Sequence, residues 1–194
     1  MHLFLASQGL GALPAFLGGA RDVLYVPTAA KPMSGQDGNR ESLVGFGHRV
    51  VDLDIDGTDD LSALDAVDAV FVEGGSPFFL LQAMRESGFD SAVTDAVRGG
   101  LPYVGMSAGA VVAGPDLEPL STTSNTALGP RLRSTEGLGL VDAVVFPHYN
   151  SRAAQYTEVE ALFGGRYDLV PLEDSQALIV DDDGSRIVPS ELKG

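Results

Sequence analysis

Short runs of consecutive apolar residues recur along the first half of the chain, separated by stretches with helical spacing. Because the apolar positions are consecutive rather than alternating, we expect strands that are covered on both faces. The expected strands lie at residues 2–6, 23–27, 49–54, 69–72 and 102–105.

Helical patterns separate the last two of these runs. The first begins at Phe78 and stops at Gly88, and the second covers residues 90–98 and stops at Gly99. The resulting alternation of strand and helix predicts an α/β fold with a doubly wound, mostly parallel sheet and right-handed crossovers.

The second half of the chain continues with fewer elements. Residues 121–133 are rich in Ser, Thr, Asn, Gly and Pro, so we expect a loop there. A strand at 143–146, a helix at about 151–163 and a strand at 167–172 follow. The chain closes with strands at 177–180 and 186–188, joined by the turn sequence DDDG at 181–184. With no internal repeat or linker, we expect a single domain over residues 1–194.

Charge and composition exclude several classes of function. The chain of 194 residues carries 27 acidic against 12 basic residues, a net charge of −15. Such a surface repels phosphate backbones and anionic lipids, so we expect neither nucleic acid nor membrane as a partner. The first seven residues lack the basic flank and the length of a signal peptide, and no run could span a bilayer. We therefore expect a cytoplasmic protein, monomeric or homodimeric.

The absence of cysteine removes disulfides, thiolate metal sites and a cysteine nucleophile. No phosphate-binding glycine loop of the GxxxxGK type and no cluster of metal ligands is present. We expect no cofactor and no metal.

The strongest local pattern is GMSAG at residues 105–109, which follows an apolar strand and precedes the apolar run AVVA at 110–113. A serine in a G-x-S-x-G turn between strand and helix is typical of a nucleophile held in a strained backbone. Small residues prevent clashes in this turn, and nearby backbone N–H groups can stabilise an oxyanion. Ser107 is therefore the candidate nucleophile, and the alternative is a turn chosen for close strand–helix packing.

A nucleophilic serine needs a base, and the chain has three histidines. His2 and His48 precede strands, at the amino ends, and are interpreted as structural or solvent-facing. His148 follows the strand 143–146, so it lies past a carboxyl end, where open α/β sheets form their ligand crevice. His148 is thus the candidate base. The acid that would orient it comes from Glu173 or Asp174, which follow the strand at 167–172, and the residues alone leave both open.

A second glycine turn, EGGSP at residues 73–77, follows the strand 69–72 and opens a helix. Its glycines let the backbone approach a ligand, so it is a candidate for half of an oxyanion hole. Ser76 and Pro77 also fit the N-cap and first position of the helix, and both roles are compatible.

Three runs together resemble the peptidase E family of serine peptidases: EGGSPFFLL at 73–81, YVGMSAGA at 103–110 and FPHY at 146–149. The resemblance spans nearly the whole chain in the right order. It implies a fold like the class I glutamine amidotransferase domain, a flavodoxin-like three-layer architecture, with serine in place of that group's cysteine. It also implies a Ser–His–acid triad and hydrolysis of dipeptides with N-terminal aspartate.

By this resemblance Ser107 and His148 take the nucleophile and base positions, and the segment 172–178 favours Asp174 over Glu173 as the acid. Gly75 and Ala108 supply the oxyanion-hole amides. The chain departs from the family pattern in carrying Ser76 where Asn or Asp is usual, and Met106 where Trp is frequent.

Two side chains are candidate substrate-binding residues. Ser76 belongs to the second glycine turn, and Arg152, just past His148, is suited to pair with a substrate carboxylate. For Arg152 the alternative is an arginine on a helix surface.

Two other functions stay open. One is an esterase or amidase of other specificity, although an α/β-hydrolase places its histidine after the acid and is usually longer. The other is a catalytically silent domain of the same fold that binds a small molecule or peptide.

Overall fold

A mostly parallel sheet of seven strands forms the centre of the protein. The computed structural model describes residues 1–33, 38–58 and 60–192. Along the sheet the strands follow the order β3-β2-β4-β5-β1-β8-β9. They are β1 (Leu3–Ala6), β2 (Asp22–Val26), β3 (Arg49–Asp52), β4 (Ala69–Val72), β5 (Tyr103–Met106), β8 (Gln176–Asp181) and β9 (Gly184–Pro189). The predicted α/β fold with a mostly parallel, doubly wound sheet is confirmed, and the predicted strands differ from these bounds by at most two residues.

The first five strands run parallel, and the closing hairpin runs against them. β1 pairs in parallel with β5 and antiparallel with β8, which turns back into β9 between Asp181 and Gly184. The turn sequence DDDG therefore forms the predicted hairpin. β9 occupies one edge of the sheet and β3 the other.

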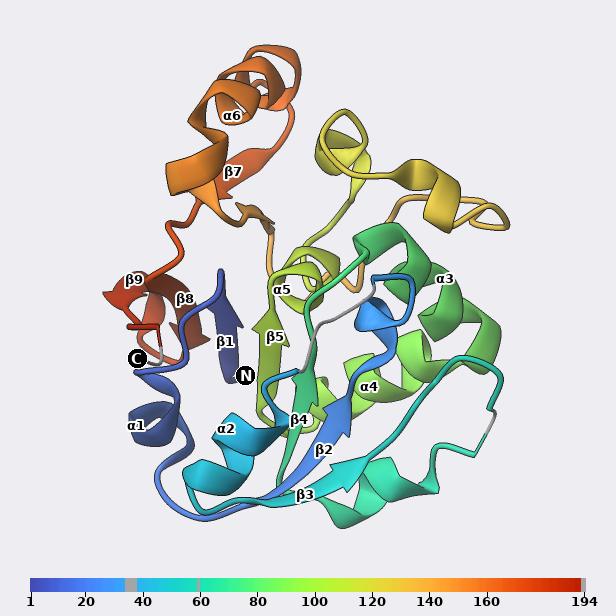
Figure 1. Ribbon diagram of the computed structural model, residues 1–194, viewed down its shortest axis with the longest axis vertical. Helices are drawn as coiled ribbons and strands as arrows, with labels where there is room; N and C mark the ends of the chain where they lie inside the picture. Colours follow the sequence, from blue (N-terminus) through green and yellow to red (C-terminus); the bar gives the residue numbers. More distant parts are fainter. Residues whose placement is uncertain (34–37, 59, 193–194) are drawn as a thin grey trace.

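Helices cover both faces of this sheet (Figure 1). On one side lie α3 (Pro77–Ser87), α4 (Phe89–Arg98) and α5 (Ala108–Val112), and on the other α1 (Leu13–Leu17) and α2 (Arg40–Gly45). Short 3-10 helices occupy Thr28–Ala30, Ser62–Ala66, Glu118–Leu120 and Thr126–Leu128. The last of these falls in the predicted loop at 121–133, and the sequence pattern did not locate α1 or α2.

Successive side chains of the central strands enter opposite cores, which explains why the strands are apolar at every position. In β1, Leu3 and Leu5 pack with α3–α5, whereas Phe4 and Ala6 pack with α1 and α2. All four are fully buried. Burial on both faces is the environment that consecutive apolar residues predict.

Two further strands stand apart from the main sheet. β6 (Ala143–Phe146) and β7 (Asp168–Pro171) pair in parallel as a separate two-stranded sheet, linked by α6 (Tyr149–Phe163). Figure 1 shows α6 and β7 beyond the carboxyl ends of β1, β4 and β5. This arrangement brings the segment after β6 to the edge of the sheet at which β5 ends.

None of the helices in the described part of the chain combines the length and apolar character that a membrane crossing would require.

Candidate active site

The turn after β5 holds Ser107 in a conformation that few residues adopt. Its backbone has φ 45° and ψ −101°, outside the regions ordinarily allowed for residues with a side chain. The Ser107 N–H donates to the carbonyl of Ala6 at 2.9 Å, and the Ser107 carbonyl accepts from Ala110 and Val111. These hydrogen bonds stabilise the strained backbone conformation of Ser107, as expected for a nucleophilic serine between a strand and a helix.

The glycines on either side of Ser107 are required by close backbone contacts. A Cβ at Gly105 would lie 2.5 Å from the carbonyl oxygen of Gly109, and one at Gly109 would lie 2.2 Å from that of Val72. Any side chain at either position would push β5, α5 and β4 apart. The glycine spacing in GMSAG thus has a packing reason as well as a conformational one.

Replacing Gly109 by alanine is therefore expected to lower the free energy of unfolding by about 1–3 kcal/mol, the usual cost of overpacking. The matched control is Gly165→Ala, because no atom of the described residues lies within 4 Å of a Cβ there. That control should change stability by less than about 0.5 kcal/mol. Urea unfolding of the two variants measures the difference, and equal midpoints would contradict the packing explanation.

His148 lies within hydrogen-bond distance of Ser107. The Ser107 Oγ and His148 Nε2 are 3.0 Å apart. His148 directly follows β6 and Pro147, has a left-handed backbone with φ 61°, and donates its N–H to the Ser7 Oγ at 2.8 Å. Ser7, which is buried at the end of β1, therefore fixes the loop that carries the imidazole.

Asp174 holds the other side of the imidazole. Its Oδ1 lies 2.7 Å from His148 Nδ1, and its Oδ2 accepts from the Asn150 side chain at 2.9 Å. The Asp174 N–H in turn donates to Asn150 Oδ1 at 3.2 Å. Glu173 is exposed, and the contact with His148 is made by Asp174.

The charge state of Asp174 decides the tautomer of the histidine. Burial raises the pKa of Asp174, but hydrogen bonds from Asn150 and His148 outweigh that effect and bring it below the ordinary value of 3.8. An ionised carboxylate only accepts hydrogen bonds, so His148 Nδ1 must donate. The unprotonated Nε2 then faces Ser107, as a base requires.

The backbone N–H groups of Gly75 and Ala108, near Ser107, have no acceptor among the described residues. Gly75 adopts φ +144°, and a Cβ there would lie 2.0 Å from the carbonyl oxygen of Ala29. The second glycine turn therefore packs closely against the backbone that follows β2. Gly75 lines both of the hollows that Ser107 lines, and Ala108 lines one of them.

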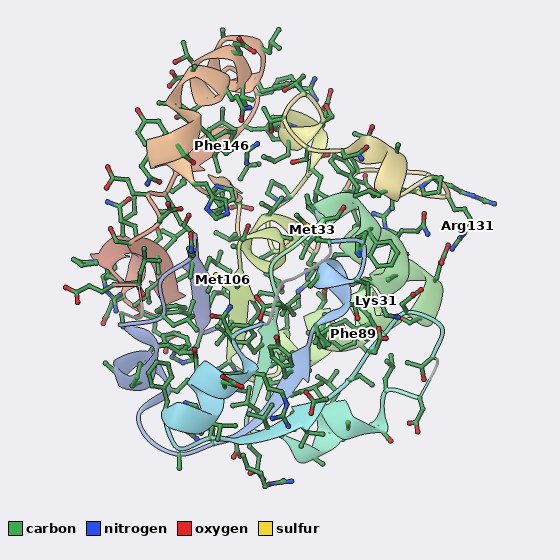
Figure 2. The ribbon with its side chains drawn as sticks, in the orientation of Figure 1. Lys31, Met33, Phe89, Met106, Arg131 and Phe146 are labelled. Carbon is green, nitrogen blue, oxygen red and sulfur yellow. The ribbon has the colours of Figure 1, made fainter. Side chains whose placement is uncertain are left out.

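Two hollows meet at Ser107. One of about 470 Å³ is lined by Glu73, Gly75 and Met106 as well as Ser107 and His148. Another of about 190 Å³ is lined by Met33, Ala108 and Arg152 and shares Gly75, Ser107 and His148. In Figure 2 the labelled Met33 and Met106, the latter at the end of β5, lie in the middle of the molecule, below the labelled Phe146.

The structure places the two predicted substrate-binding residues differently. Arg152 lines the smaller hollow, where its guanidinium donates to the carbonyl of Thr123 and lies 4.9 Å from the centre of the Phe146 ring. Burial lowers the pKa of Arg152. The Ser76 Oγ instead accepts from the N–H of Phe79 at 3.3 Å, as the N-cap of α3. Ser76 lines neither hollow at Ser107 and faces a third one of about 560 Å³.

The remaining histidines lie away from this site. His2 is exposed before β1, and His48 is buried before β3, with its Nδ1 accepting from the N–H of Arg21 at 3.1 Å. Within the described ranges, no group of three or more His, Asp or Glu side chains is placed to hold a metal ion.

The sequence analysis assigned no role to three residues of the site: Ser7, Asn150 and Glu73, the last of which opens the EGGSP run. Ser7 and Glu73 are polar residues at the carboxyl ends of apolar strands, β1 and β4, the same position that pointed to His148. Asn150 lies two residues after His148. A polar residue at the end of an apolar strand was therefore a usable signal for Ser7 and Glu73, but not for Asn150.

The fold and the contact between a strained serine and a histidine define an α/β protein of the serine hydrolase class. Comparison with known proteins identifies the family within this class. The model of Peptidase family S51 matches residues 7–188 of the chain. The chain belongs to this family and is a serine-type peptidase.

Related sequences and structures agree with that assignment. An uncharacterised peptidase of Listeria monocytogenes is 28% identical over 92% of this chain and 94% of its own length. Peptidase E of Streptomyces coelicolor is 47% identical over 48% of this chain and 37% of its own. A solved structure described as a peptidase E protein from Listeria monocytogenes EGD-e superimposes with a TM-score of 0.86, at 26% identity and with 98% of each chain covered.

Proposed function

We propose that the protein hydrolyses short peptides by acyl transfer, with Ser107 as nucleophile, His148 as base and Asp174 as acid. The observation that carries the proposal is the unbroken chain of contacts from the Ser107 Oγ through His148 to Asp174, at 3.0 and 2.7 Å. His148 Nε2 takes the proton as the Ser107 Oγ attacks the scissile carbonyl.

The later steps use the same groups. The carbonyl oxygen becomes an oxyanion, which accepts hydrogen bonds from the N–H groups of Gly75 and Ala108. Protonated His148 gives its proton to the leaving amine. Water, activated by His148, then releases the acyl group from Ser107 and restores the site.

For the substrate we propose dipeptides with N-terminal aspartate. Arg152 supports this choice, because it lines the hollow beside Ser107 and has no acidic partner among the described residues. A partly buried guanidinium without an anion is suited to the side-chain carboxylate of aspartate. The named peptidase E relatives are consistent with a small peptide substrate.

Hydrolysis of a dipeptide panel tests the proposal. Asp-Leu, Glu-Leu, Asn-Leu, Ala-Leu and Leu-Leu are compared with wild type and with Ser107→Ala. Cleavage of Asp-Leu by wild type alone supports both the chemistry and the aspartate preference. Serine-dependent cleavage of the other members would discard the preference. No cleavage of any member would contradict the proposal and favour an amide, ester or binding function of the same fold.

Activity is expected to fall in acid, because a protonated His148 cannot accept the Ser107 proton. The lowered pKa of Asp174 means that its contribution to folding is fully present above about pH 4 and is lost only below that value. A loss of kcat/KM between pH 8 and pH 5, with an unchanged circular dichroism spectrum, would therefore be assigned to the imidazole. A flat profile over this range would contradict the role of His148.

A further inference from the structure

A buried carboxylate that the proposed mechanism does not use lies in the wall of the larger hollow. Glu73 follows β4, and the residue is 3% exposed. Its Oε2 accepts from the Tyr25 hydroxyl at 2.7 Å and from the Asn39 N–H at 2.8 Å. Its Oε1 accepts from the Asn39 side-chain amide at 2.9 Å and from the Gly74 N–H at 2.8 Å.

All four partners of Glu73 are neutral donors. Burial and the charge of Glu73 raise the pKa of Tyr25, so this hydroxyl keeps the proton that it donates. Among the described residues, no Lys, Arg or His forms an ion pair with Glu73. Buried charges in proteins are usually paired. Here the charge is fixed in position and is not neutralised.

Because of this charge, the charged side chains that line the two hollows at Ser107 are of opposite sign. The described lining of the larger hollow contains Glu73 and no Lys or Arg, whereas that of the smaller hollow contains Arg152 and no Asp or Glu. The backbone next to Glu73 reaches the nucleophile, because a Cβ at Gly74 would lie 3.3 Å from the Ser107 Cβ. A substrate carbonyl at Ser107 would therefore have a negative wall on one side and a positive one on the other.

We propose that Glu73 is a specificity-determining residue that selects substrates with a free α-ammonium group. The inference rests on the proposed cleavage after the first residue, since there the ammonium is only two bonds from the scissile carbonyl carbon. With that carbonyl at Ser107, the ammonium lies in the Glu73 hollow and the aspartate side chain in the Arg152 hollow. The four donors already occupy the acceptor sites of Glu73, so it acts on the ammonium through its charge rather than through a direct hydrogen bond.

The test compares Asp-Leu with succinyl-leucine, which has the same skeleton and carboxylates but hydrogen in place of the ammonium. For wild type we expect kcat/KM for Asp-Leu to exceed that for succinyl-leucine about tenfold or more. Glu73→Gln should abolish this preference. We expect it to lower kcat/KM for Asp-Leu and to leave kcat/KM for succinyl-leucine unchanged or higher. Tyr25→Phe is the matched control, because it removes one donor to Glu73 but leaves the charge, so the preference should persist.

A purely structural role for Glu73 gives a different result. If Glu73→Gln lowers kcat/KM for both compounds by the same factor, or leaves the preference intact, the inference is wrong. Wild type provides a test that needs no variant. The α-amino group loses its proton near pH 8, so the preference for Asp-Leu should disappear as the pH rises past that point. A preference that stays constant through pH 9 would overturn the inference.

Failure of the proposed function is distinguishable from failure of this inference. The former appears as the absence of Ser107-dependent hydrolysis. In that case calorimetric binding of the same two compounds to Ser107→Ala still measures the ammonium preference. Equal affinity for Asp-Leu and succinyl-leucine would overturn the role of Glu73 there as well.

Discussion

Replacing Ser107 by alanine is expected to lower kcat/KM for the cleaved dipeptide about a thousandfold or more. The Oγ that lies 3.0 Å from His148 Nε2 is removed, so no acyl-enzyme can form. Loss of a triad nucleophile usually leaves only the acceleration due to binding and the oxyanion hole. Steady-state kinetics of Asp-Leu hydrolysis measures the effect.

Stability and a second serine serve as controls for this prediction. Alanine also carries a Cβ, so the strained turn at position 107 should be retained and the thermal midpoint should change little. Ser185→Ala, on the exposed edge strand β9, should keep wild-type activity. If Ser107→Ala keeps near-normal activity while Ser185→Ala behaves as expected, Ser107 is not the nucleophile.

The fold was predictable because its central strands are buried on both faces. Leu3, Phe4 and Leu5 are consecutive apolar residues. Leu3 and Leu5 pack into the core on one face of the sheet, and Phe4 packs into the core on the other face. Glycine and aspartate turns marked the ends of α3, α4 and the closing hairpin. The α1 and α2 helices are only five and six residues long, too short to show a helical period.

The arrangement of β6 and β7 was not predictable from the same pattern. Val144 and Val145 are fully buried, as they would be in a strand of the main sheet. Local hydrophobicity reports burial, but it does not report which neighbour a strand hydrogen-bonds. In the structure β6 pairs with β7, with Ala143 opposite Asp168, and the two strands form a sheet separate from the main one.

For the site, strand ends and chain order were sufficient to bring Ser107 and His148 together. They did not indicate Asn150, because a hydrogen bond between side chains depends on rotamers that the sequence pattern does not specify. They also did not indicate Glu73, whose four partners come from β2, from the segment before α2 and from its own turn. Such a convergence of distant segments is visible only in three dimensions.

Replacing Asp174 by asparagine is expected to lower kcat/KM about a thousandfold to ten-thousandfold, nearly as much as removing the nucleophile. The reason is the partner on the far side of the carboxylate. The Asn150 side chain donates to Asp174 Oδ2 at 2.9 Å, so an asparagine at 174 would turn its carbonyl oxygen toward Asn150. Its NH2 group would then face His148 Nδ1 and force that nitrogen to accept. The proton moves to Nε2, which can no longer take the proton of Ser107.

Glu173→Gln is the matched control, because it removes one negative charge from the adjacent position. Glu173 is exposed, so this variant should keep activity within a few fold of wild type. Both replacements keep the size of the side chain, so both variants should fold, and Asp174→Asn should have the lower thermal midpoint because it loses the stabilising charge of Asp174. A loss in Glu173→Gln as large as that in Asp174→Asn would assign the acid to Glu173. Full activity in Asp174→Asn would instead mean that the tautomer of His148 does not depend on this carboxylate.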